Sequence, residues 1–175
     1  MPFFSENAFP ESNAKQMSIS EMNNRYKNGS LKTPAFQRKY VWAKSMQQGY
    51  LRTLAKNGPI HGAIINHNTE TSIDWIMDGQ NRLKTIIYFM DGKLSYEPNY
   101  DNDDLPCVRI KYSDFDEIEK RKFDNLNISY IETRNWSDTI SQEHFREIQE
   151  SVKLKEGEKI HSSSENLFSK KIVEI

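Results

Sequence analysis

Residues 73–92 read IDWIMDGQNRLKTIIYFMDG, and this stretch contains a strand pattern followed directly by a helix pattern. The segment Ile73-Asp74-Trp75-Ile76-Met77 is rich in β-branched and aromatic residues, which favour a strand. From Leu83 onwards, apolar residues recur with helical spacing until Gly92, a residue type that commonly ends a helix. The stretch therefore predicts a strand, a turn at Asp78–Arg82 and a helix.

The turn Asp78-Gly79-Gln80-Asn81-Arg82 carries residue types that suit a phosphate. The first amides of a helix lack partners within the helix, and glycine lets an anion approach them. Arg82 offers several donors to phosphate oxygens, and Asp78 can hold a magnesium ion or position a water molecule. A second interpretation is that Asp78 caps the helix while Arg82 pairs with a nearby acid. On the residues alone it is the simpler one, because short glycine motifs often occur by chance.

Outside this stretch, the chain mixes helix and strand patterns without strict alternation. Ser18-Ile19-Ser20-Glu21 is a capping box and predicts a helix that Gly29 ends. The other expected elements are an extended segment at 33–42, helices at 44–57, 114–124, 141–152 and 162–173, and strands at 63–65, 106–112 and 128–133. We expect a flexible N-terminal arm over residues 1–16 and a single domain over residues 17–175. This mixture predicts an α+β fold rather than a doubly wound sheet.

Composition excludes several classes of protein. The 175 residues contain 24 Lys plus Arg and 25 Asp plus Glu, a net charge of -1, and no run approaches the ~18 apolar residues of a membrane helix. No secretory signal follows Phe4, so we expect a cytoplasmic protein, or one of the host-cell interior if it is viral. Cys107 is the single cysteine, which rules out an internal disulfide and a Cys-based zinc site. The motifs GxxxxGK[ST], GxGxxG and HExxH are absent.

The charge is distributed unevenly along the chain. Residues 1–60 hold nine basic and three acidic side chains, a sum of +6, so the remainder sums to -7. Within the basic segment, Phe36-Gln37-Arg38-Lys39-Tyr40-Val41-Trp42 places cations among aromatic rings, a pattern typical of nucleotide or nucleic-acid contacts. The simpler interpretation of the pattern is a strand with its rings in the core and its cations in water.

Two spaced segments resemble the motifs of the DUF262 family. Residues 33–42, TPAFQRKYVW, resemble the family pattern "PxFQRxYxW", and residues 77–86, MDGQNRLKTI, resemble "DGQQRLTT" in the same order. Downstream, residues 145–151 and 154–158 are similar to the segment "FxxxNxG…L…GE", so the resemblance runs from about residue 17 to residue 159. The family is the ParB/sulfiredoxin-like NTPase domain in the S half of the GmrSD modification-dependent restriction enzymes.

The resemblance implies a compact α+β domain, with a small mixed sheet flanked by helices, that binds a nucleoside triphosphate and hydrolyses it with Mg2+. By motif match, the catalytic residues are Asp78, Gln80 and Arg82, with Asp78 as the magnesium ligand. The residues that would bind nucleotide and phosphate are Gln37, Arg38, Gly79, Asn81 and Arg82. The additional pocket residues are Tyr40, Trp42, Gln149 and Glu158.

The chain departs from the family pattern at three points. Asn81 replaces the second Gln of one motif, Gln149 and Ser151 replace the Asn and Gly of the downstream segment, and the helical lobe and nuclease domain of full-length members are missing. An isolated sensor domain, a fragment and a stand-alone relative all remain open.

We predict a magnesium-dependent NTPase domain of a DNA restriction or defence-type protein. Its candidate partners are DNA and a nuclease effector domain or subunit. The alternative is a catalytically silent, ParB-like module that binds DNA or another protein.

Overall fold

The computed structural model describes residues 12–37, 39–60, 62–102 and 104–151. Two compact units divide the chain, residues 1–137 and residues 138–175, and each is considered by itself. Whether residues 17–175 form a single domain stays a prediction. The helix expected at 162–173 lies outside the described residues.

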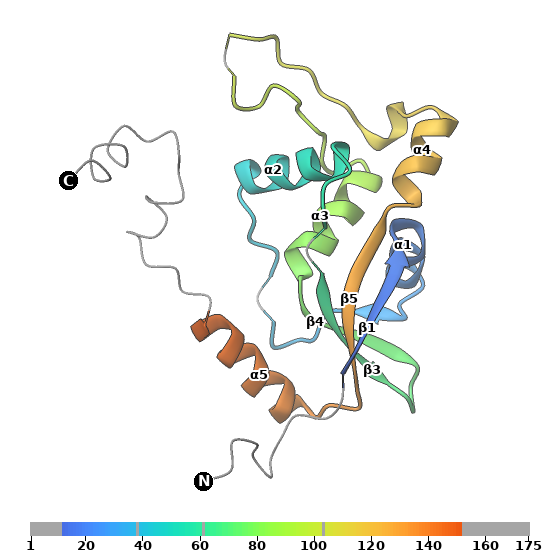
Figure 1. The fold of residues 1–175 in the computed structure, drawn as a ribbon, viewed down its shortest axis with the longest axis vertical. Helices are drawn as coiled ribbons and strands as arrows, with labels where there is room; N and C mark the ends of the chain where they lie inside the picture. The colour runs from blue at the N-terminus through green and yellow to red at the C-terminus, as the bar shows by residue number, and fades with distance from the viewer. Residues whose placement is uncertain (1–11, 38, 61, 103, 152–175) are drawn as a thin grey trace, which may run out of the picture. The chain divides into compact units, whose positions relative to one another are not determined.

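The first unit contains a five-stranded mixed sheet with the strand order β1-β5-β3-β4-β2 (Figure 1). Its strands are β1 (Ser12–Ser18), β2 (Leu31–Lys32), β3 (Ala63–Asn68), β4 (Ile73–Asp78) and β5 (Asn127–Arg134). The pairs β1/β5 and β3/β4 are antiparallel, whereas β3/β5 and β2/β4 are parallel. Mixed pairing without regular βαβ units confirms the α+β class.

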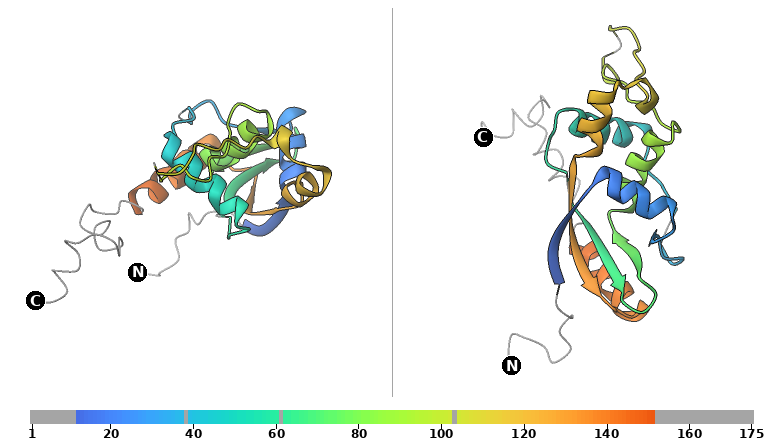
Figure 2. Two further views of the ribbon diagram at one scale, coloured as in Figure 1. Left: turned by 90° about the horizontal axis from the view of Figure 1, so that it is seen from above. Right: turned by 90° about the vertical axis from the view of Figure 1, so that its right-hand side faces the viewer.

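The helices of the first unit pack against the sheet and share one hydrophobic core with it. They are α1 (Ile19–Lys27), α2 (Lys44–Ala55), α3 (Gln80–Met90), the short 3-10 helix η1 (Tyr112–Asp114) and α4 (Glu117–Asp124). One hydrophobic cluster joins Met22 of α1, Leu51 of α2 and Ile86 of α3 to Ile65 and Ile76 of the sheet. Helices α2 and α3 pack against each other, as do α1 and α4, which lie side by side in Figure 2.

The second unit contributes α5 (Asp138–Ser151). No helix in residues 12–37, 39–60, 62–102 or 104–151 is long and apolar enough to span a membrane.

Three expectations about local structure were wrong. Residues 12–16, expected in a flexible arm, belong to β1, because pairing with β5 from Ser12↔Thr133 to Ser18↔Asn127 holds an edge strand whose side chains are mostly exposed. Residues 106–112 form no strand beyond a single bridge between Tyr96 and Ile110. Residues 33–42 are not extended throughout, because a turn follows Pro34.

Candidate functional site

The junction between β4 and α3 has the predicted strand–turn–helix form, and Gly79 makes its tight turn. Gly79 is the N-cap of α3 and has a φ of 84°, in the left-handed region that favours glycine. A Cβ at this position would lie 3.0 Å from Ala63 Cβ and 3.1 Å from Ala63 Cα. Glycine is therefore needed here both for the backbone conformation and for the close approach of α3 to β3.

Arg82 lies in the first turn of α3, and one nitrogen of its guanidinium makes two hydrogen bonds. Its Nη2 donates to the carbonyl of Gly62 at 2.8 Å and to Asp78 Oδ2 at 2.9 Å. Its Nε is buried and has no hydrogen-bond partner among the described residues. Asp78 thus does not cap the helix through its side chain, since Gly79 is the cap, and the acid that pairs with Arg82 is Asp78 itself.

Gln37 pins the loop that follows β2 to the end of β4. Its Nε2 donates to the carbonyls of Ile76, at 2.8 Å, and of Met77. Ile64 pairs with Asp78 but Ile65 pairs with Ile76, so Met77 is an extra residue in β4 at a bulge. Gln37 therefore stabilises carbonyls beside this bulge, and its amide donors are not free for a phosphate.

The same loop is fastened to α3 by its aromatic end. Asn81 Oδ1 accepts from the Val41 amide at 3.2 Å. The Tyr40 hydroxyl and Thr85 Oγ1 are 2.9 Å apart, and burial raises the pKa of Tyr40. The Tyr40 ring meets Tyr88 edge-on, with centroids 5.1 Å apart. Tyr40 is therefore held by packing, as the simpler interpretation expects, but Phe36 is 38% exposed and does not lie in the core.

Ion pairs account for most of the basic segment. Five of its nine basic residues pair with acids of the remaining chain, in the pairs Lys15–Glu132, Arg25–Asp74, Lys27–Asp91, Lys44–Glu97 and Arg52–Asp101. Around the β4–α3 junction, Lys39 and Lys84 have no carboxylate partner among the described residues, and burial lowers the pKa of Lys84. Two cations without an acidic partner thus belong to α3 and to the loop attached to it.

The remaining predicted residues are placed as follows. Gln80 is buried in the first turn of α3, and Trp42 packs edge-on against Tyr50 of α2 with centroids 5.4 Å apart. Gln149 is in α5 of the second unit. Arg38 and Glu158 lie outside the described residues.

Sequence reasoning missed four residues of this region, namely Tyr50, Gly62, Lys84 and Thr85. The hydroxyl of Tyr50 on an otherwise apolar helix face was the signal available for that residue. A second cation on the same helix, two residues after Arg82, was a comparable signal for Lys84.

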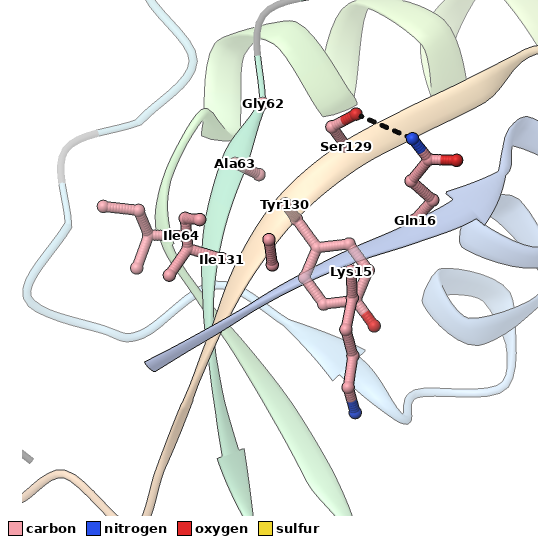
Figure 3. Close-up of a pocket in the computed structure, with 9 residues that line it drawn as sticks. Lys15, Gln16, Gly62, Ala63, Ile64, Ser129, Tyr130 and Ile131 are labelled. Atoms are coloured by element: carbon pink, nitrogen blue, oxygen red, sulfur yellow. Dashed lines mark hydrogen bonds between the residues drawn. The ribbon is translucent and has the colours of Figure 1, made fainter. Parts of the chain in front are cut away.

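A pocket of about 590 Å³ lies on the opposite face of the sheet from the core (Figure 3). Ile64, Ser129 and Ile131 line it and alternate along their strands with buried residues. Gly62 also lines the pocket, and Lys15, the cation of the lining, donates to Glu132. The pocket is thus lined mainly by apolar residues, together with Gln16 and Ser129, and its cation is already paired, so it does not suit a phosphate group.

Comparisons with known proteins give two results. A family model described as "GmrSD restriction endonuclease, N-terminal domain" matches residues 19–174. Among solved structures, the chain is similar to the C-terminally truncated chromosome-partitioning protein ParB from Caulobacter crescentus complexed with CTP-γ-S, with a TM-score of 0.44 and 10% identity. That alignment covers 82% of this chain and 55% of the ParB chain. A search of curated proteins finds no match.

Proposed function

Because this chain belongs to the family of GmrSD restriction endonuclease N-terminal domains, we propose that it binds a nucleoside triphosphate at the N-terminal end of α3. In this proposal Arg82 contacts the phosphates, and binding serves a DNA restriction or defence function together with a nuclease effector.

The observation that carries the proposal is that only one nitrogen of the Arg82 guanidinium makes hydrogen bonds within the described residues. Its Nη2 is occupied by the Gly62 carbonyl and Asp78, while Nε is buried without a partner and Nη1 has no acceptor among the described residues. The guanidinium therefore has donors that make no bond within the described residues, and such donors suit charge-assisted hydrogen bonds to phosphate oxygens. The positive end of the α3 helix dipole favours the same ligand.

One lysine of α3 and one of the loop attached to α3 provide further positive charge. Lys84 is partly withdrawn from water without an acid beside it, which lowers its pKa and disfavours its charged form. An anion bound nearby would offset that cost. Lys39 belongs to the loop whose neighbours Tyr40 and Val41 contact α3.

Asp78 fits a magnesium ion that arrives with the nucleotide. Its Oδ2 accepts from Arg82, its side chain is 41% exposed, and Oδ1 has no partner in the part of the chain that the structure describes. Mg2+ commonly binds through one or two carboxylates together with substrate phosphates. The described residues hold no group of three or more His, Cys, Asp or Glu for a metal ion, so the phosphates would complete the coordination. The ion would neutralise charge that develops on the phosphates during hydrolysis.

Hydrolysis of the nucleotide is the second part of the proposal. In it, Gln80 orients the attacking water molecule. Gln80 is only 7% exposed, so it would have to move to orient a water molecule. The roles of Gln37 and Asn81 change as well. Both hold the loop in place, and we propose them as positioning residues rather than phosphate ligands.

The DNA-binding alternative receives less support from the contacts. Binding to duplex DNA requires basic side chains that are free to neutralise phosphates. In residues 1–60, Lys32, Lys39 and Lys56 are the described basic residues without an ion pair, since the other five are paired with acids.

Equilibrium binding of ATP, GTP, CTP and UTP, with and without Mg2+, tests the proposal. We expect at least one nucleotide to bind and Arg82→Gln to weaken that binding at least tenfold. Arg52→Gln is the matched control, because Arg52 is similarly exposed and pairs with Asp101 on the surface. Phosphate release measures hydrolysis separately. The proposal fails if the folded wild type binds none of the four nucleotides, or if the two variants bind equally well.

A further inference from the structure

Tyr50 is a buried tyrosine whose hydroxyl has no partner. It lies in α2, its side chain is 9% exposed, and its Oη makes no hydrogen bond within the described residues. Trp42, from the loop that is fastened over α3, packs against the ring. Buried polar groups normally have a partner, so an unpartnered hydroxyl in a well-packed position points to a ligand or water that completes it.

The charge of Arg82 acts on the ionisation of Tyr50. Burial raises the pKa of Tyr50 to about 12, and the positive charge of Arg82 acts against this rise. Tyr50 therefore remains a neutral donor at neutral pH. The two side chains come from α2 and α3, which pack against each other. Each contributes a buried atom without a partner, Oη from Tyr50 and Nε from Arg82.

We propose that Tyr50 is a phosphate-binding residue whose hydroxyl donates to the same anionic oxygen that accepts from Arg82 Nε. This inference rests on the proposed nucleotide-binding function and adds a second donor, from a second helix, to that site. An anionic oxygen satisfies both atoms at once, because the guanidinium and the neutral hydroxyl are both donors. The phosphate would thus connect α2 and α3 through hydrogen bonds when the nucleotide binds.

The competing explanation is a purely structural tyrosine, and a matched variant separates the two. Tyr112 provides the comparison, since its hydroxyl is also held neutral, with a pKa raised to about 12 by burial and by Asp124, to which it donates at 2.8 Å. Tyr112→Phe removes a hydrogen bond that the folded protein already makes. Tyr50→Phe removes a hydroxyl that makes none, so it should leave the urea midpoint unchanged or raise it.

The experiment measures nucleotide affinity and urea unfolding for the wild type, Tyr50→Phe and Tyr112→Phe. We expect Tyr50→Phe to weaken triphosphate binding by about ten- to a hundredfold, because a lost hydrogen bond to a charged group has that effect. Tyr112→Phe should lower the urea midpoint and bind nucleotide as the wild type does. Wild-type affinity in Tyr50→Phe overturns this inference and leaves the proposed function standing, whereas absent binding by the wild type overturns both.

A double-mutant cycle with Arg82→Lys tests the shared oxygen. Lysine keeps the charge but lacks the Nε donor, so the effect of Tyr50→Phe should be smaller in that background than in the wild type. An equal loss of affinity in the two backgrounds would show that Tyr50 and Arg82 contact different atoms, and the inference would be wrong.

Discussion

Replacing Gly79 by alanine tests whether the β4–α3 turn depends on both backbone conformation and space. The residue has a φ of 84°, and the new methyl group would lie 3.0 Å from Ala63 Cβ, 3.1 Å from Ala63 Cα and 3.3 Å from Arg82 Nη2. Ala63 is the first residue of β3, is 3% exposed and pairs with Tyr130 of β5, so it has little room to retreat. We expect Gly79→Ala to destabilise the first unit and to disturb the anchoring of Arg82.

The magnitude follows from two separate costs. A non-glycine residue in the left-handed region costs about 1–2 kcal/mol. Inserting a methyl group into a packed contact costs about 1–3 kcal/mol. The free energy of unfolding should therefore fall by about 2–5 kcal/mol, which lowers the urea midpoint by about 1–2.5 M if the denaturant dependence is about 2 kcal/mol per M.

Gly92 and Gly49 are the controls for the two costs. Gly92 also has a positive φ, 71°, but nothing lies within 4 Å of an added Cβ, so Gly92→Ala should cost only about 1–2 kcal/mol. Gly49 is inside α2 with open space around it, so Gly49→Ala should stabilise the protein by about 0.5–1 kcal/mol. Urea unfolding followed by circular dichroism measures all three. If Gly79→Ala costs no more than Gly92→Ala, the close contact with Ala63 does not constrain the turn and our reasoning is wrong.

Two further predictions concern contacts around the loop and α2. Gln37→Ala should cost about 1–3 kcal/mol in urea unfolding, because two carbonyls lose their donor. Gln37→Glu should cost more, because a carboxylate facing two carbonyls cannot donate to them, and equal losses would contradict this role. The hydrogen bond from Lys44 lowers the pKa of Glu97 below its usual 4.5, so the stability that this carboxylate contributes is present above pH 4.5 and lost as the pH falls through the lowered value. The difference in unfolding free energy between wild type and Glu97→Gln should therefore shrink from about pH 6 to about pH 3, and a difference independent of pH would refute the assignment.

The local sequence pattern was sufficient to predict the secondary structure at the centre of the candidate site. The strand, the glycine turn and the helix were predictable because the apolar spacing changes at Asp78, and both the strand and the helix lie within 20 residues. The Asp78–Arg82 pair also follows from helical spacing, since the two residues are four apart. The residue types left open whether the turn binds a phosphate, or whether Asp78 caps the helix while Arg82 pairs with a nearby acid.

Long-range contacts account for the features that sequence reasoning missed. Gln37 donates to carbonyls about forty residues away, and Arg82 donates to a carbonyl twenty residues earlier. Backbone acceptors carry no sequence signal, so neither contact could be identified from residue types. The edge strand β1 was missed for the same reason, because backbone pairing with β5 holds it while its side chains show no apolar alternation.

The uneven charge of the chain also acquired a different meaning. A +6 segment beside a -7 remainder suggested a polyanion partner, yet five of the nine basic side chains in the segment pair with acids of the remainder. Charge asymmetry along a sequence indicates an external partner only when the two halves do not fold against one another.

The position of β5 in the sheet sets the order in which the protein can assemble. β5 lies between β1 and β3, although it is the last of the five strands in the chain. While the protein is being synthesised, β3 and β4 can form their hairpin early, but β1 must wait for a partner that follows it by more than a hundred residues. Such a non-local pairing is slow to form because a long loop has to close first. The turn that carries Arg82 is thus translated well before the sheet that supports it is complete.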